Sequence, residues 1–199
     1  PKDLCTIEFM ERIIDSGVKV FKIEGRARSA EYVKRCASCY RRAADAVCEG
    51  NYTAEYGASL KEELSSVFNR GFWDGYYQGA YLGQWSEIYG SHASRRKVYC
   101  GKVTNWFNRI GVAEILVEST PLKLGMQAMA IGATTGVVDF TVNDMRVNLN
   151  PAEVAAKGVR CSVAIVPDEV RNADGTPVDE TVPFEKLHRG DKIYIWEDN

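Results

Sequence analysis

The chain has 199 residues, of which 45% are hydrophobic and 26% charged, with a formal net charge of −2. These values are ordinary for a globular protein, and the near-neutral charge excludes a strong overall attraction to nucleic acid. No apolar run approaches the roughly 20 residues that cross a bilayer, and no signal-peptide pattern is present, so we expect no membrane partner and a cytoplasmic location. The chain starts at Pro1 rather than Met, from which we expect a fragment of a longer protein.

The first predicted helix covers residues 4–16, where apolar side chains recur at intervals of three and four residues. Asp3 is its expected N-cap and Gly17 its expected C-terminal stop. Next, residues 18–23 (Val-Lys-Val-Phe-Lys-Ile) carry the β-branched and aromatic side chains of a buried strand. Ser29 then caps a predicted helix that extends to Cys48. A helix, a buried strand and a second helix in this order are typical of an α/β fold with a parallel sheet.

The predicted strand ends in Glu24, Gly25 and Arg26, and functional groups of α/β barrels gather at the carboxyl ends of strands. A carboxylate and a guanidinium at this position would bind a polar or anionic substrate. The alternative is an ion pair that closes the end of the barrel. Lys2 and Asp3 lie just before the first helix and are candidates for a second strand end.

The second predicted helix has a basic side, because Lys34 and Arg35 recur seven residues later as Arg41 and Arg42. This side is either a surface that contacts phosphate groups or a solvated helix face. Cys36 and Cys39 lie in the same helix without Gly or Pro nearby, so buried thiols are a better reading than a metal pair. The absence of a secretion signal favours reduced cysteines throughout the chain.

Residues 57–70 predict another helix, and residues 69–85 form a segment rich in glycine and aromatic residues without a clear period. These aromatic rings would either stack on unpaired bases or hold the segment against the rest of the fold. A linker-like composition at residues 90–96 marks the expected domain boundary. We therefore divide the chain into residues 1–56 (end of an α/β barrel), 57–95 (connecting segment) and 96–199 (a β domain).

The β domain shows six short predicted strands separated by Gly, Pro and Asn: 98–104, 111–117, 126–131, 137–142, 159–166 and 192–196. Six such strands predict a small antiparallel barrel. A weak internal echo links residues 122–132 and 187–196, because each has a leucine, a glycine three residues later and then a strand. Conventional hydrolase motifs are missing: His92 and His188 are the only histidines, and neither a His-Glu-x-x-His helix nor a Gly-x-Ser-x-Gly turn occurs.

Two stretches carry a family resemblance: residues 1–5 (Pro-Lys-Asp-Leu-Cys) and residues 20–33, which contain Lys-Ile-Glu-Gly-Arg. Together with Asn-Arg-Gly-Phe at residues 69–72, they resemble the collagenase-like peptidase family, peptidase family U32. Residues 111–119, 135–148 and 190–196 resemble its C-terminal domain. Residues 135–145 resemble most closely the group implicated in hydroxylating the wobble uridine of tRNA.

The resemblance implies the last part of a TIM-type barrel, followed by a β-barrel similar to the β-domains of elongation factors. It implies a 4Fe–4S cluster in the parent protein, with Cys5 as one of four thiolate ligands, so the fragment alone would hold none. Glu24 and Arg26 are the implied catalytic residues. The candidate substrate-binding residues are Lys2, Asp3, Arg28, Tyr32, Arg35 and Arg42.

The implied activity of the parent is tRNA hydroxylation, with RNA as its partner and the β-barrel as an accessory domain that positions it. The alternative is a peptidase, as the family label says. We expect the isolated fragment to be inactive, because it has too few barrel strands to build a site, and its incomplete sheet to favour dimerisation.

Overall fold

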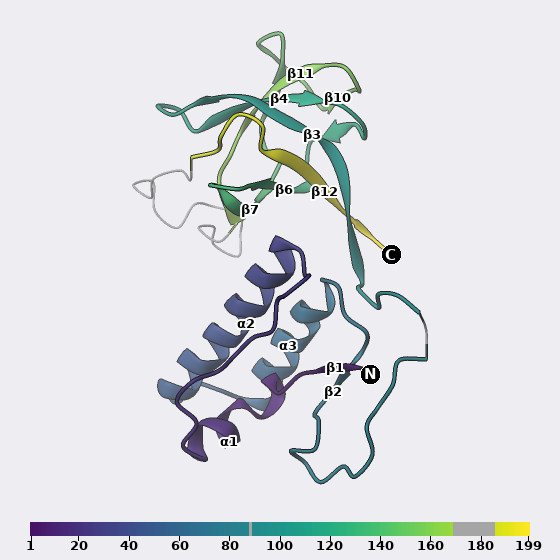
Figure 1. Ribbon diagram of the computed structural model, residues 1–199. Helices are drawn as coiled ribbons and strands as arrows, with labels where there is room; N and C mark the ends of the chain where they lie inside the picture. The colour runs from purple at the N-terminus through teal and green to yellow at the C-terminus, as the bar shows by residue number, and fades with distance from the viewer. Residues whose placement is uncertain (88, 169–185) are drawn as a thin grey trace. The chain divides into compact units, whose positions relative to one another are not determined.

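The computed structural model describes residues 1–87, 89–168 and 186–199, and it divides the chain into two compact units. Unit 1 comprises Pro1–Arg96 with Asp198–Asn199, and unit 2 comprises Lys97–Glu197. Helices are confined to unit 1 among these residues, and unit 2 is built from strands (Figure 1). None of the described helices is long and apolar enough to cross a membrane.

The N-terminus of unit 1 is a short strand rather than a helix cap. β1 (Asp3–Leu4) pairs in parallel with β2 (Phe72–Trp73), and it is followed by the 3-10 helix η1 (Ile7–Phe9) and by α1 (Met10–Asp15). The predicted N-cap at Asp3 is therefore wrong, because its carboxylate binds Arg70 instead of a helix amide. The first helix begins later than predicted because the chain first runs beside β2.

Residues 18–23 do not form the predicted strand. This segment has no ladder partner among the described residues, and Val18, Val20, Phe21 and Ile23 are exposed, Val20 to 82%. A strand needs a neighbour to bond its backbone N–H and C=O groups, and no described segment offers one. The incomplete TIM-type barrel and the dimer expected from it accordingly remain predictions.

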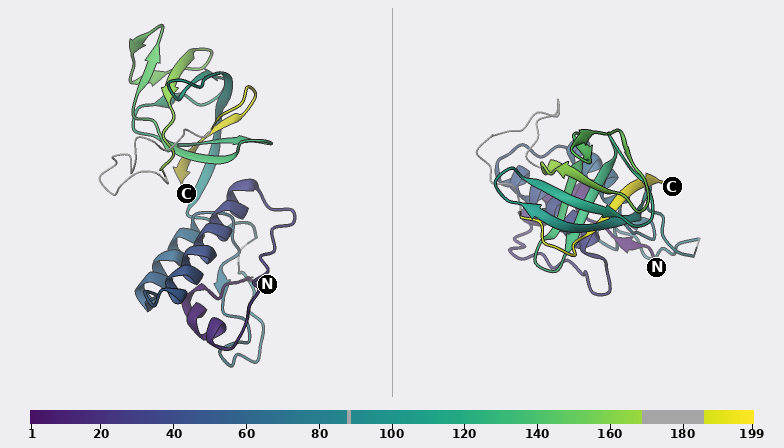
Figure 2. Two further views of the ribbon diagram at one scale, coloured as in Figure 1. Left: turned by 90° about the vertical axis from the view of Figure 1, so that its left-hand side faces the viewer. Right: turned by 90° about the horizontal axis from the view of Figure 1, so that it is seen from above.

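The two long helices of unit 1 agree with the periodic pattern. α2 (Ala30–Cys48) begins after Ser29 as predicted, and α3 (Ala54–Ser65) begins earlier than predicted. The difference at α3 comes from Thr53, whose side chain accepts a hydrogen bond from the Tyr56 amide and so caps the helix. α2 and α3 lie side by side in both side views (Figures 1 and 2).

The core of unit 1 is small and rich in sulfur. Cys36 and Cys39 lie on the buried side of α2, which confirms the prediction of buried helical thiols. They pack with Cys5, Ile7, Met10, Ala43, Leu60 and Leu64. This core holds η1 and α1 against α2 and α3, and so fixes the position of Asp3.

The aromatic segment after α3 is only partly packed. Phe72 packs against the unit 1 core, and the Trp73 ring meets the Tyr76 ring edge-on at 5.3 Å between centroids. Tyr76, Tyr77, Tyr81 and Trp85 are all exposed, Tyr81 to 95%. Of the two roles expected for the aromatic rings of residues 69–85, packing against the rest of the fold is seen for the rings at the start of the segment.

Unit 2 contains all six strands that the sequence predicts, and every pairing between them is antiparallel. They are β3 (Arg95–Phe107), β4 (Val112–Val117), β6 (Gln127–Gly132), β7 (Gly136–Thr141), β11 (Arg160–Ala164) and β12 (Lys192–Asp198). Four short strands were not predicted: β5 (Leu122–Lys123), β8 (Met145–Val147), β9 (Asn150–Pro151) and β10 (Val154–Ala155). Two or three residues give too little alternation to reveal such strands in a sequence.

The sheet of unit 2 closes into a barrel. Its strand order is β7-β6-β12-β3-β4-β11-β8-β9, and an antiparallel bridge between Phe140 and Pro167 joins β7 to the chain just after β11. The six predicted strands thus surround one apolar core, in which Ile115, Phe140 and Ile193 are fully buried. The antiparallel β fold expected for this part of the chain is confirmed.

The internal echo in the sequence has a structural counterpart. Gly125 donates its amide hydrogen to the carbonyl of Val142, and the Val142 amide donates to Met126; Gly190 and Asp191 bond to Val103 in the same way. Gly125 (φ 81°) and Gly190 (φ 95°) both adopt the left-handed conformation that favours glycine. The two strands that follow, β6 and β12, pair with each other. The repeated Leu-x-x-Gly pattern therefore marks two equivalent turns of the barrel.

Candidate functional site

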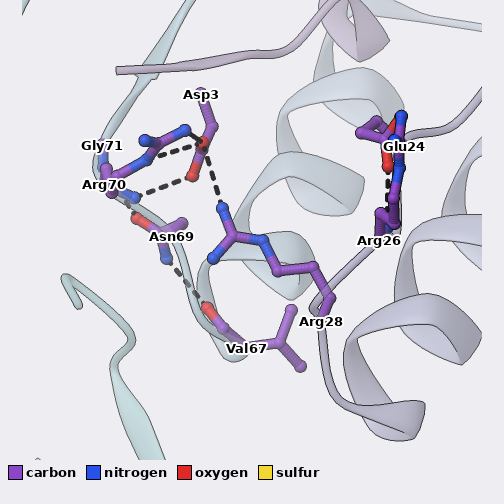
Figure 3. Close-up of polar contacts among 8 residues, drawn as sticks. All are labelled: Asp3, Glu24, Arg26, Arg28, Val67, Asn69, Arg70 and Gly71. Atoms are coloured by element: carbon purple, nitrogen blue, oxygen red, sulfur yellow. Dashed lines mark hydrogen bonds and ion pairs between the residues drawn. The ribbon is translucent and has the colours of Figure 1, made fainter. Parts of the chain in front are cut away.

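Asp3 is the centre of a polar cluster in unit 1 (Figure 3). One carboxylate oxygen, Oδ2, accepts the Arg70 backbone amide at 2.9 Å. The other, Oδ1, accepts from the Arg70 side chain, at 3.0 Å from Nε and 2.6 Å from an Nη atom. The Asp3 side chain is 15% exposed. Charge-assisted bonds in such a sheltered position are among the stronger polar contacts in proteins.

The loop before β2 places Arg70 beside Asp3. Asn69 is buried, and its side-chain amide donates to the carbonyls of Ser65 and Val67 at 3.2 and 3.0 Å. Its carbonyl oxygen accepts the Gly71 amide at 3.0 Å, and the Gly71 carbonyl accepts the Asp3 amide at 2.8 Å. Gly71 needs its left-handed φ of 79° to make this turn. Hydrogen bonds of Asn69 and Gly71 thus connect the end of α3 to the loop before β2, and that loop to β1.

Arg28 reaches the same carboxylate from the start of α2. An Nη atom of Arg28 lies 3.6 Å from Asp3 Oδ1, and its guanidinium carbon lies 4.3 Å from the centre of the Phe68 ring and 5.3 Å from that of Tyr32. Burial raises the pKa of Tyr32 to about 12, so its phenol stays neutral near pH 7. Two guanidinium groups therefore share one carboxylate, and the cluster carries a net positive charge.

Glu24 and Arg26 lie apart from this cluster (Figure 3). The Arg26 amide donates to Glu24 at 2.8 Å, and their side chains form a 3.5 Å ion pair with 88% of Arg26 and 58% of Glu24 exposed. Hydrogen bonds from the Arg26 backbone and side chain lower the pKa of Glu24. Their predicted catalytic role is untested, and in this structure they form a local surface pair.

The arginines on the predicted basic side of α2 are paired with acidic neighbours. Arg35 and Arg42 both bind Glu63 of α3, Arg35 at 2.7 Å, and Arg41 binds Asp45 at 2.8 Å. Lys2, another predicted binding residue, donates to the side chain of Gln84 at 3.1 Å. The structure thus brings Asp3, Arg28 and Tyr32 together, and it places Lys2, Arg35 and Arg42 in separate contacts.

Glu63 makes the packing of α2 on α3 sensitive to pH. Burial alone would raise its pKa, but the hydrogen bonds and charges of Arg42 and Arg35 outweigh burial and lower it. A lowered carboxyl pKa contributes stability above the unfolded-state value of about 4.3, and this contribution disappears as the pH falls through the folded-state pKa. We expect Glu63→Gln to destabilise unit 1 at about pH 7 and to have much less effect near pH 3.

Urea unfolding of the unchanged protein and of Glu63→Gln, between about pH 7 and about pH 3, measures the difference in their free energies of unfolding. Asp45→Asn, which breaks the exposed pair with Arg41, is the matched control and is expected to change stability by less than about 0.5 kcal/mol at every pH. A Glu63→Gln deficit that stays constant down to about pH 3 would contradict the assignment of the stabilisation to the ionised carboxylate.

Cys5 lies in the core of unit 1. It is the residue that the family resemblance implies as one ligand of a 4Fe–4S cluster. Its sulfur accepts a hydrogen bond from the Tyr40 hydroxyl at 3.8 Å, and burial raises its pKa. No three His, Cys, Asp or Glu side chains in the described ranges could hold a metal ion together. A 4Fe–4S cluster needs four thiolates, so these residues do not fit such a cluster by themselves.

The described residues contain two contacts between a hydroxyl and an imidazole. Ser86 Oγ lies 2.9 Å from His92 Nε2 on an exposed loop, and no carboxylate among the described residues contacts the ring to orient it. In unit 2, Thr135 Oγ1 lies 2.8 Å from His188 Nδ1 and donates to Asp191 Oδ2 at 2.5 Å. Since Asp191 takes the only hydroxyl hydrogen, His188 is not placed to remove it. Neither contact has the arrangement of an activated nucleophile.

The main residue that sequence reasoning missed is Arg70. It lies 67 positions from Asp3, and no local pattern connects the two. The signal available was the Asn-Arg-Gly-Phe segment itself, in which a buried Asn and a left-handed Gly flank the arginine. The helix predicted over residues 57–70 includes Phe68, but Phe68 lies beyond the end of α3 and its ring contacts the Arg28 guanidinium.

Residues 1–86 match the model of peptidase family U32. This part of the chain belongs to that family. A relative named collagenase, from Porphyromonas gingivalis W83, is 47% identical over 193 residues, which are 96% of this chain and 44% of that protein. The relative named tRNA hydroxylation protein P, from Haemophilus influenzae, is 30% identical over 158 residues, which are 79% of this chain and 33% of that protein. The chain therefore spans less than half the length of either protein.

Solved structures give a weaker likeness. The crystal structure of the C-terminal domain of a Geobacillus thermoleovorans putative U32 peptidase covers 49% of this chain and 90% of that domain, with 9% identity and a TM-score of 0.38. A likeness at this TM-score supports no conclusion about function.

Proposed function

We propose that this U32 chain is the C-terminal part of an RNA-modifying enzyme that hydroxylates the wobble uridine of tRNA, with the β-barrel as an accessory domain that positions the RNA. The observation that carries the proposal is the cluster at Asp3, where two arginines share one sheltered carboxylate. Its surplus positive charge suits a negatively charged substrate such as RNA. A tRNA substrate would also place the protein in the cytoplasm.

Two relatives support the choice of RNA. Proteins named tRNA hydroxylation protein P from Haemophilus influenzae and Escherichia coli are 30% and 29% identical to this chain. In the proposed full-length protein, residues 18–23 pair with further strands of an α/β barrel, and Glu24 and Arg26 then lie at its mouth. Cys5 is the one cluster ligand that this chain would contribute, and no step of the proposal depends on the cluster.

The second candidate is a peptidase, which the 47% identity to a protein named collagenase favours. The buried thiols of this chain are unsuited to the role of a cysteine nucleophile. Burial raises the pKa of Cys36, and it raises the pKa of Cys39 and Cys100 to about 11, whereas a reactive cysteine needs a lowered pKa and access to substrate. The hydroxyl–imidazole contacts described above lack the geometry of a serine or threonine nucleophile. The RNA reading is therefore the better supported of the two.

Mass spectrometry of tRNA nucleosides tests the proposal in the organism that encodes this protein. A strain without the gene is expected to lose a hydroxylated uridine, and so is a strain that carries Arg26→Ala. Arg41→Ala, which removes an exposed arginine paired with Asp45, is the matched control and should leave the nucleosides unchanged. A normal nucleoside profile in the deletion strain would reject tRNA hydroxylation, and peptide hydrolysis by the purified protein would become the next assay.

A further inference from the structure

The two arginines that face Asp3 are held in different ways. Arg70 makes three hydrogen bonds to the carboxylate, one from its backbone and two from its side chain. The contact of Arg28 with Asp3, at 3.6 Å, is longer than a hydrogen bond. The backbone amide of Arg28 donates to the Gly25 carbonyl, but its guanidinium makes no hydrogen bond within the described residues. Arg28 is thus attracted to the Asp3 carboxylate by charge, while the N–H groups of its guanidinium donate no hydrogen bond to that carboxylate.

Aromatic rings hold Arg28 in place of hydrogen bonds. Phe68 and Tyr32 lie 4.3 and 5.3 Å from its guanidinium carbon, and 22% of the side chain is exposed. Rings that contact the face of a guanidinium leave the N–H groups at its edge available for an acceptor in the same plane. This combination of reduced hydration, restricted motion and available donors suits a bidentate oxyanion.

We propose that Arg28 binds an oxyanion of the substrate, a phosphate or a carboxylate group, and that Arg70 is a positioning residue that holds Asp3 in place. The inference rests on the proposed function, because it assigns the substrate-binding group of the same site. Asp3 orients Arg28 by its charge, and Arg70 balances the Asp3 carboxylate, so that the positive charge of Arg28 is left for the anion. The three residues therefore have separate roles: contact, orientation and support.

NMR of the arginine Nε–H groups tests the inference in the 199-residue chain. Inorganic phosphate and acetate are titrated separately, and the resonances of Arg28, Arg70 and Arg41 are followed. We expect a saturable shift at Arg28 with at least one anion, a smaller shift at Arg70, and none at Arg41, which is exposed and paired with Asp45. Phosphate binding tighter than acetate binding would indicate a phosphate ligand, and the reverse order a carboxylate.

Two substitutions separate binding from folding. Arg28→Lys keeps the charge but loses the planar pair of donors, and it is expected to weaken anion binding about tenfold, the equivalent of one good hydrogen bond. Arg70→Lys is expected to lower the urea midpoint of unit 1 while the folded protein still binds the anion through Arg28. Equal shifts at Arg28 and Arg41, or unchanged affinity in Arg28→Lys, would overturn the inference.

The same variants distinguish this inference from the proposed function. If the anion shifts Arg28 in a saturable manner but deletion of the gene leaves tRNA nucleosides normal, the site stands and the RNA assignment fails. If the deletion removes the hydroxylated uridine but no anion shifts Arg28, the function stands and the Arg28 site is rejected.

Discussion

Asp3→Ala is expected to lower the free energy of unfolding of unit 1 by about 3 kcal/mol, because removal of one partner from a sheltered ion pair leaves the other charge uncompensated. The substitution removes three hydrogen bonds from Arg70 and leaves two guanidinium groups facing each other. It also leaves the loop before β2 held to β1 by backbone contacts alone. Amide hydrogen exchange measures the effect, because it reports on each unit separately.

The control for this prediction is Asp45→Ala, which removes an exposed carboxylate from its pair with Arg41 within α2. It is expected to change stability by less than about 0.5 kcal/mol. Protection in unit 2 should stay unchanged in both variants. Equal effects of Asp3→Ala and Asp45→Ala would mean that the Asp3 cluster does not stabilise unit 1.

Gly101→Ala is expected to destabilise unit 2 by about 3 kcal/mol, near the upper end of overpacking costs. A Cβ atom on Gly101 would lie 2.0 Å from the Leu116 carbonyl oxygen and 3.1 Å from the Val117 Cα atom. Both atoms belong to the backbone of β4, so they cannot move without disrupting the pairing of β3 with β4. Urea unfolding followed by hydrogen exchange in β4 and β11 measures the loss.

Gly158→Ala provides the comparison within the same unit. Nothing lies within 4 Å of its Cβ position, but its φ of 87° makes alanine strained, at a cost of about 1 kcal/mol. The difference between the two substitutions isolates the steric clash at β4. A Gly101→Ala protein as stable as Gly158→Ala would show that the two strands can separate at little cost.

The candidate site of unit 1 combines rigid and exposed elements. Asp3 in β1 binds Arg70 just before β2, and the two strands pair. Glu24 and Arg26 lie in a segment that pairs with no strand in the part of the chain that the structure describes. A substrate that contacted both groups would need this segment to be ordered by pairing with another strand. The proposed activity thus depends on sheet partners for residues 18–23, whereas the Arg28 anion site depends only on contacts within unit 1.

The sequence by itself determined the elements that depend on local pattern. Alternation of buried and exposed side chains identified the six main strands of unit 2, and the spacing of apolar residues identified α2. The Leu-x-x-Gly echo was readable because a left-handed glycine is a local requirement of the turn. The Pro-Lys-Asp-Leu-Cys and Lys-Ile-Glu-Gly-Arg stretches were enough to indicate the family, which the match over residues 1–86 confirmed.

Only the tertiary structure decided which charges meet. Asp3 reads as a helix cap until Arg70, 67 residues away, is placed against it. The basic side of α2 reads as a binding surface until Glu63 of α3 is found paired with both Arg35 and Arg42. Residues 18–23 have the composition of a strand, but a strand forms only when a neighbour accepts and donates its backbone hydrogen bonds. Propensity is a property of a segment, whereas pairing and ion-pair geometry depend on which segments the fold brings together.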